Sequence, residues 1–66
     1  MSVAKVIELS ATSPESFEGA IQAGIAKAHE SLRGISGAWV KEQKVEISDG
    51  NITEYRVNLQ VTFVLD

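Results

Sequence analysis

Hydrophobic and polar residues alternate along the last part of the chain, from position 52 to position 65. The hydrophobic series occupies every second position: Tyr55, Val57, Leu59, Val61, Phe63 and Leu65. A period of two is typical of a β-strand with one face against a core. Residues 35–48 are predicted to form a second long strand, and the sequence "SDGN" joins the two. Asp-Gly between strands is the signature of a tight type I′ hairpin.

The turn of this hairpin determines which residues lie opposite one another. If Asp49 and Gly50 form the two-residue loop, Ser48 pairs with Asn51. Counting outward gives three further pairs, namely Ala38 with Val61, Trp39 with Gln60, and Val40 with Leu59. A β-bulge in so long a hairpin would shift part of this register.

Alternation also assigns the two faces of the hairpin. Ala38 and Val40 share the hydrophobic face, where we expect a helix to pack. The polar face is predicted to carry Trp39, Lys41, Gln43, Glu54, Arg56, Asn58, Gln60 and Thr62. The only tryptophan of the chain therefore lies among polar residues, which is an unusual place for a large flat ring.

The first half of the chain is predicted to form a strand and a helix. Residues 3–10 are rich in β-branched residues and are followed by a turn-like "ATSP". Ser13 and Pro14 are suited to begin a helix, which we expect to continue to Arg33 and to end at Gly34. One hydrophobic stripe runs along it: Phe17, Ile21, Gly24, Ile25, Ala28 and Leu32. The small residues in this stripe would allow the helix to approach a sheet closely.

These elements predict an α+β fold of β-α-β-β order, with a three-stranded antiparallel sheet around one helix and a single domain over residues 1–66. The helix covers only one face of the sheet. The strands are long for so small a protein, so the far end of the hairpin should extend past the helix. The hydrophobic residues predicted in that extension are Val45, Ile47, Ile52 and Tyr55. Exposed hydrophobic residues of this kind favour contact with another subunit.

Composition narrows the possible functions. The chain has 66 residues, a net charge of −3, no cysteine and one histidine. Disulfides, thiolate zinc sites and multi-histidine zinc sites within one chain are therefore excluded, and self-association is the leading way to complete so small a core. The absence of cysteine fits a reducing cytoplasm. No membrane span or signal peptide is predicted, and six scattered Lys and Arg residues argue against nucleic-acid binding.

Few residues suggest chemistry. A single His29 without a nucleophile motif makes an enzyme improbable, so we predict none. Four carboxylates surround the hairpin end, namely Glu42, Glu46, Asp49 and Glu54. They could bind Ca²⁺, but their spacing matches no EF-hand and favours a solvated surface. Trp39 either fills a subunit interface or stacks on a flat ligand whose polar edge bonds to Gln60, with Arg56 or Asn58 nearby.

The chain resembles the dodecin family over nearly its whole length. The resemblance rests on "ELSATSPESFEGAI", "AGIAKAHESLRGI", "VKEQ" and "YRVNLQVTFVLD", taken in that order. It implies a homododecamer that forms a hollow sphere and stores or sequesters flavins, which are riboflavin, FMN or FAD, as stacked pairs between tryptophans.

Alignment of "VKEQ" with the family pattern implies specific positions in this chain. The flavin-stacking tryptophan position falls on Gly37, and the glutamine that bonds the flavin edge falls on Arg56. Trp39 lies two residues farther on, on the same face and about 7 Å along the strand. The resemblance therefore implies a flavin site at Gly37, Trp39, Arg56 and Gln60. The alternative is a dodecin-like shell that lacks flavin and binds a cation such as calcium, with Trp39 at the subunit interface.

Overall fold

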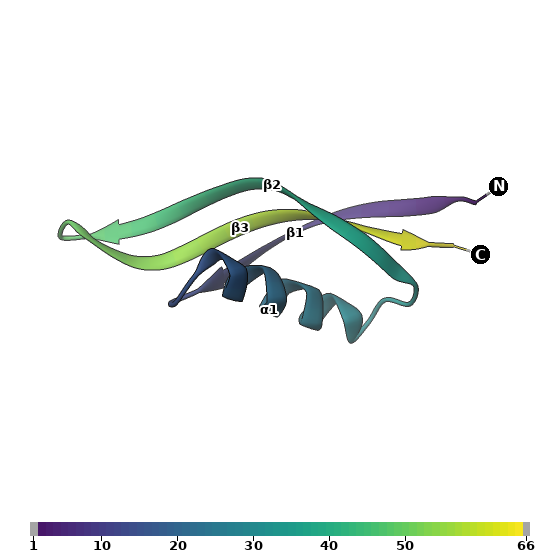
Figure 1. The fold of residues 1–66 in the computed structure, drawn as a ribbon, viewed down its shortest axis with the longest axis horizontal. Coiled ribbons are helices and arrows are strands. Elements are labelled where there is room, and N and C mark those ends of the chain that lie inside the picture. The colour runs from purple at the N-terminus through teal and green to yellow at the C-terminus, as the bar shows by residue number, and fades with distance from the viewer. Residues whose placement is uncertain (1, 66) are drawn as a thin grey trace.

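The computed structural model describes residues 2–65 and shows three strands and one helix in β-α-β-β order (Figure 1). The elements are β1 (Ala4–Ser13), α1 (Phe17–His29), β2 (Ile35–Ser48) and β3 (Asn51–Val64). The strands form one antiparallel sheet in the order β1-β3-β2. The predicted α+β fold with a three-stranded antiparallel sheet is confirmed. Within residues 2–65, no helix has the length and hydrophobicity that a membrane span requires.

The β2–β3 hairpin has the predicted turn. Asp49 has a φ of 54° and Gly50 a φ of 77°, as a type I′ turn requires at both central positions. Ser48 lies opposite Asn51. The three other predicted pairs are also confirmed, namely Ala38 with Val61, Trp39 with Gln60, and Val40 with Leu59.

Register shifts in the β2–β3 ladder change which face of the sheet is occupied by the residues between these matching pairs. Thr53 is an extra residue in β3, and Lys41 is an extra residue in β2, so the register shifts by one between them and then returns. As a result, Gln43 lies opposite the fully buried Val57, and Glu42 lies opposite Asn58. The predicted position of Gln43 on the polar face is therefore wrong. The cause of this error is the bulge at Lys41, where two successive residues share one face.

The helix is shorter than predicted at both ends. Its N-cap is Ser16, whose Oγ accepts a hydrogen bond from the backbone N–H of Gly19 at 2.9 Å. Ser13 is instead the last residue of β1, opposite Tyr55, so the predicted start at Ser13 and Pro14 is wrong. At the other end the helix stops at His29, not at Arg33. Thirteen residues span about 20 Å, since each adds about 1.5 Å.

Gly34 has the predicted left-handed conformation but serves a different purpose. Its φ is 76°, and its carbonyl oxygen accepts a hydrogen bond from the backbone N–H of Val64 at 3.0 Å. Gly34 therefore directs the chain from the helix exit into β2 and does not end the helix itself.

The core lies between α1 and the sheet strands β1 and β3. Its buried members are Ala20, Val57, Leu59 and Val61. Gly24 is what allows the helix to come so close, because a Cβ there would lie 3.1–3.2 Å from side-chain atoms of Leu9, Ala11 and Leu59. The close approach predicted for Gly24 is confirmed, whereas Ala20, which lies at the centre, was missing from the predicted stripe.

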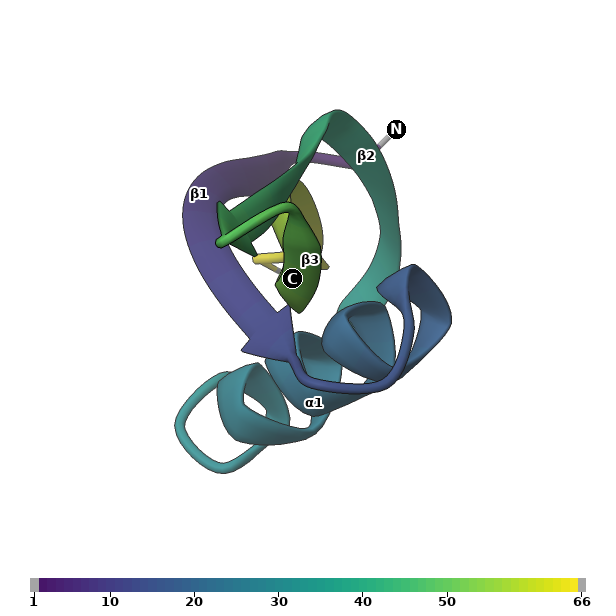
Figure 2. The same cartoon turned by 90° about the vertical axis from the view of Figure 1, so that its left-hand side faces the viewer.

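The helix makes little contact with β2, contrary to prediction. It packs against β1 and β3, so Ala38 and Val40 remain exposed, and Val40 keeps 40% of its surface. The reason is the order of the strands: β3 is central, and a single helix on the β1 side leaves the other edge uncovered. Figure 2 shows the sheet curving around one side of the molecule with α1 below it.

The hairpin extends beyond the N-terminal end of α1 (Figure 1). We define the arm as residues 45–54. Ile47 and Ile52 lie opposite each other in it and keep 63% and 52% of their surface exposed. Tyr55, which was predicted to extend past the helix as well, instead meets Phe17 edge-on, with ring centroids 5.1 Å apart.

The subunit is too elongated to resemble an isolated small domain. It measures 51 × 20 × 13 Å, with a radius of gyration of 13.5 Å. A compact chain of this length would have a radius of gyration of about 11 Å. Much of the hydrophobic surface therefore has no cover within one copy.

Candidate functional site

The candidate site is the sheet face turned away from α1, which we call the open face. Trp39 of β2, Gln60 of β3 and Glu8 of β1 form one row across it, because Gln60 pairs with both of the others. The Trp39 side chain is half-exposed, at 51%. The next row contains Gly37 and Thr62, and a Cβ added to Gly37 would meet nothing within 4 Å. The indole therefore borders a position on β2 that carries no side chain.

An ion pair crosses the central strand beside this row. The Lys41 ammonium lies 3.3 Å from Oε1 of Glu8, so a β2 side chain reaches over β3 to a β1 side chain. Lys41 can do this because it lies two residues from Trp39, on the same face of β2. The floor beside the indole thus offers an amide, an ammonium and a carboxylate.

Arg56 lies on the same face but in a different place. It is four residues from Gln60 along β3, which corresponds to about 13 Å. Its Nη1 donates to Oγ of Ser10 at 2.9 Å, and its Nε lies 3.7 Å from Oε2 of Glu46. Lys44, directly opposite Arg56, is 3.5 Å from the same carboxylate oxygen. Two cations therefore share one anion, and Glu54, opposite Glu46, and Glu42, opposite Asn58, lie on the same face beside them.

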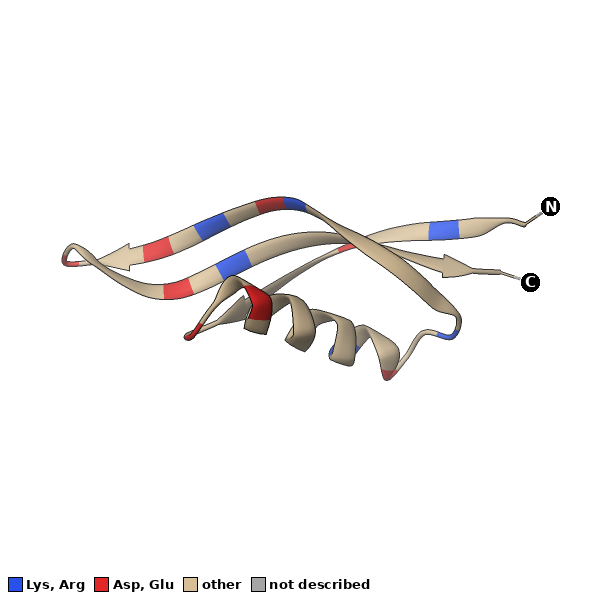
Figure 3. Ribbon diagram, in the orientation of Figure 1, with Lys and Arg blue, Asp and Glu red and all other residues tan. Residues whose placement is uncertain are grey.

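The structure thus divides the residues predicted for the site. It brings Gly37, Trp39 and Gln60 together and places Arg56 with Lys44 farther along the sheet. Asn58 lies between the two groups and donates from Nδ2 to Oε1 of Glu42 at 3.0 Å. Charges alternate in sign along this part of β2 (Figure 3).

The open face offers one aromatic surface to a flat ring but does not enclose it. The indole offers one aromatic surface, and the other side of a stacked ring would face solvent unless a second subunit covered it. Residues 2–65 contain no group of three or more His, Asp and Glu side chains that could hold a metal ion. His29 is the exposed last residue of α1. The helix packs on the other face of the sheet, so His29 is not part of the open face.

Sequence reasoning missed Glu8 and Lys44 on the open face, whereas it predicted Lys41 there beside Trp39. Glu8 joins the row only because β3 is the central strand, which nothing in the hairpin pattern reveals. Lys44 lies on the open face because of the bulge at Lys41. One sign of the bulge was available: the hydrophobic residues on the helix side of β2 are spaced by an odd number between Val40 and Val45.

Comparison with known proteins identifies the family of this chain. A sequence model of the Dodecin family matches residues 3–66. The chain belongs to the dodecin family. The Thermus thermophilus dodecin is 42% identical over 64 residues, which cover 97% of this chain and 93% of that relative. The Mycobacterium tuberculosis calcium dodecin is 38% identical over 63 residues, covering 96% and 89% respectively.

Solved dodecin structures share the fold of this family member. A crystal structure of a Thermus thermophilus dodecin variant superposes with a TM-score of 0.93 at 41% identity, covering 100% of this chain and 98% of the other. The Mycobacterium tuberculosis calcium dodecin, described as having a novel calcium-binding site, gives a TM-score of 0.84 at 38% identity, covering 98% and 93%. The resemblance inferred from the sequence is confirmed.

Proposed function

We propose that this chain assembles into a closed homododecameric shell that binds and stores a flavin between its subunits and catalyses no reaction. Membership of the dodecin family supports assembly. The elongated subunit with its uncovered hydrophobic residues supports it independently. The absence of cysteine is compatible with a reducing cytoplasm as the place of storage.

The observation that carries the flavin proposal is the half-exposed Trp39 beside Gln60, with Gly37 leaving the neighbouring position of β2 without a side chain. A flavin ring has hydrophobic faces and a polar edge. Trp39 would stack on a face, and the Gln60 amide would bond the edge, because an amide both donates and accepts. Gly37 leaves room for the ring along the strand. A two-fold axis through this face would bring a second indole to the other side of the stack.

Arg56 has a separate role in this proposal. FMN and FAD carry phosphate at the end of a ribityl chain, so the ring can lie at Trp39 while the phosphate reaches toward Arg56. Arg56 and Lys44 are two cations at this end of the face whose only ion-pair partner among the described residues is Glu46. We therefore expect FMN to bind more tightly than riboflavin, and the difference to decrease with salt.

Fluorescence titration tests the proposal. Riboflavin and FMN are each titrated with the protein, and a visible spectrum of the purified protein is recorded first. We expect quenching of both flavins, loss of quenching in Trp39→Ala, and retention of most of it in Trp39→Phe, which keeps an aromatic face. Arg56→Gln should lower the affinity for FMN to that for riboflavin and leave the affinity for riboflavin unchanged. Wild-type protein that quenches neither flavin would refute flavin storage.

Calcium binding is the second candidate, because a calcium dodecin is 38% identical to this chain. A site would have to combine carboxylates from several subunits, since residues 2–65 of one copy hold no such group. Glu46 and Glu54, which lie directly opposite each other on the open face, are the nearest pair of candidates. Colourless protein whose melting temperature rises with Ca²⁺ and not with FMN would favour this function over flavin storage.

A further inference from the structure

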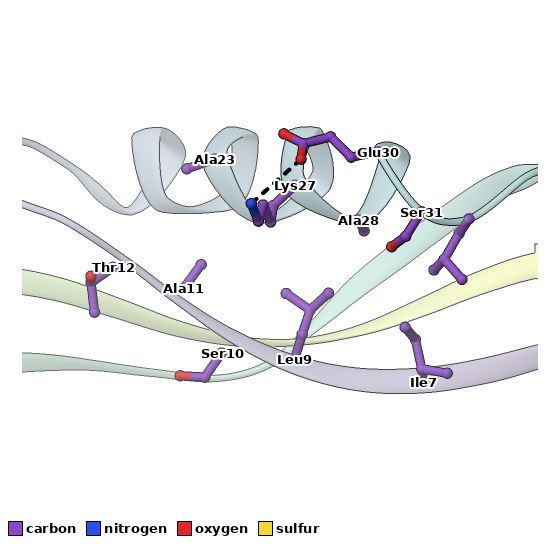
Figure 4. A pocket seen from close by; sticks show the side chains of 12 residues that line it. Ile7, Leu9, Ser10, Ala11, Thr12, Ala23, Lys27, Ala28, Glu30 and Ser31 are labelled. Atoms are coloured by element: carbon purple, nitrogen blue, oxygen red, sulfur yellow. Dashed lines mark hydrogen bonds and ion pairs between the residues drawn. The ribbon is translucent and has the colours of Figure 1, made fainter.

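The ion pair between Lys41 and Glu8 differs from the other charged contacts of this chain. Of the ion pairs within residues 2–65, it is the one that joins the two edge strands, β1 and β2, and its partners lie 33 positions apart in the sequence. The pair between Lys27 and Glu30, by contrast, joins positions three apart at the rim of the groove between α1 and β1, as helix surfaces commonly do (Figure 4). An exposed pair adds about 1 kcal/mol or less to stability, so the crossing of β3 contributes little to the fold.

The crossing places an ammonium group beside the amide of Gln60. Gln60 lies directly opposite both Trp39 and Glu8, and Nζ of Lys41 is 3.3 Å from Oε1 of Glu8. Neighbouring strands are about 4.8 Å apart, so the ammonium and the amide can reach the same edge of a small ring. Both side chains of the ion pair are 47% exposed. An ammonium has three donors, of which Glu8 takes one, so Lys41 has donors to offer a ligand.

We propose that Gln60 and Lys41 together recognise an imide edge, in which an N–H lies between two carbonyl groups. The Gln60 amide can donate to one carbonyl and accept from the N–H, and Lys41 can donate to the second carbonyl. Glu8 holds the ammonium in place and is a positioning residue. The flavin ring has such an edge. This inference therefore rests on the flavin binding proposed above and names the groups that select the ring.

The same arrangement disfavours rings that carry an amino group at this edge. An ammonium has no acceptor, so an amino group next to Lys41 would leave donors facing one another. A ring of the adenine type could still stack on Trp39, since stacking needs only an aromatic face. The indole thus gives affinity for flat rings in general, and the polar groups beside it give the choice among them.

Isothermal titration calorimetry with riboflavin and 3-methylriboflavin tests the inference, because the methyl group replaces the N–H of the imide. We expect 3-methylriboflavin to bind the wild type about tenfold more weakly than riboflavin, and Lys41→Met to bind riboflavin about tenfold more weakly than the wild type. The matched control is Lys44→Met, which removes a lysine from the same face of β2, five residues or about 17 Å from Trp39. It should bind riboflavin as the wild type does, because riboflavin has no phosphate.

Two thermodynamic cycles separate recognition from a merely structural role. The 2-thio and 4-thio analogues of riboflavin each replace one carbonyl by a weaker acceptor, and for one of them Lys41→Met should cause no further loss of affinity. Glu8→Gln should weaken riboflavin binding severalfold in the wild type but not in Lys41→Met, because Glu8 acts through the lysine. Far-UV spectra and light scattering establish that each variant keeps its fold and its assembly.

The outcomes distinguish this inference from flavin binding itself. Equal affinity of the wild type for riboflavin and 3-methylriboflavin would overturn imide recognition, while flavin binding would stand. Wild-type affinity for riboflavin in Lys41→Met would overturn it as well. A wild-type protein that binds no flavin would refute both. If Lys41→Met did not fold, Lys41→Gln would take its place, and the two ligands on the wild type would still decide.

Discussion

Two glycines of this chain allow the same small substitution to be made in opposite surroundings. Gly24→Ala adds a methyl group to a helix pressed against the sheet, where it would lie 3.1 Å from Leu9 and 3.2 Å from Ala11 and Leu59. Gly37→Ala adds one to a strand where nothing lies within 4 Å, and Gly37 is not among the glycines with positive φ. The two variants therefore differ in packing and not in chemistry.

The magnitudes predict opposite signs. Alanine favours a helix over glycine by about 1 kcal/mol, but an extra methyl group in a tight core costs about 1–3 kcal/mol. The terminal carbons of Leu9 and Leu59 can move aside, whereas the Cβ of Ala11 cannot move without its backbone, so the cost should exceed the gain. We expect Gly24→Ala to lose about 1 kcal/mol of unfolding free energy. Gly37→Ala should gain about 0.4–1 kcal/mol, because it restricts the unfolded chain.

Thermal unfolding followed by circular dichroism measures this difference. One kcal/mol corresponds to roughly 4–8 °C in a domain of this size, so the two variants should melt on opposite sides of the wild type. All three proteins must be compared at one concentration, because association couples to stability. If Gly24→Ala were stabilised as much as Gly37→Ala, the helix would not be pressed against the sheet at Gly24 and the reasoning would be wrong.

Three further predictions concern the helix start and the open face. Ser16→Ala should lower the free energy of unfolding by about 1 kcal/mol in urea denaturation, because it removes the N-cap bond to Gly19. Breaking the pair between Lys41 and Glu8 should cost less than about 1 kcal/mol in a double-mutant cycle, since both side chains are 47% exposed. Gly37→Trp should fold normally and quench riboflavin more strongly than the wild type, because a side chain at Gly37 starts in open space, with nothing within 4 Å of its Cβ, and adds a second indole to the face.

The hairpin could be predicted in detail because its information is local. The Asp-Gly turn fixes the register at one end, and the alternation of the β3 residues fixes the faces. The pairs of Trp39 with Gln60 and of Val40 with Leu59 followed from counting alone. Counting gave these pairs correctly because the extra residue in β3, Thr53, offsets the extra residue in β2, Lys41. The segment between the two bulges, which includes Gln43, was assigned to the wrong face for the same reason.

The remaining errors arise from information that is not local. Ser13 and Ser16 both suit an N-cap, and the choice is made by pairing of Ser13 with Tyr55 across the sheet. The uncovered state of Val40 depends on the strand order, which a single sequence does not specify. The candidate site is therefore predictable at Trp39 and Gln60, which belong to one hairpin, but not at Glu8, which a distant segment supplies.

The weak contact between α1 and β2 affects when the strand that carries Trp39 becomes rigid. Among residues 2–65, the ladder to β3 and a few side chains are what attach the tryptophan-bearing strand to the rest of the subunit. Segments with few buried contacts open at low free energy, so amide hydrogens of β2 should exchange fast in a free subunit. A neighbour that covers this strand would slow the exchange, and the ligand would then meet a rigid indole only after the subunits have come together.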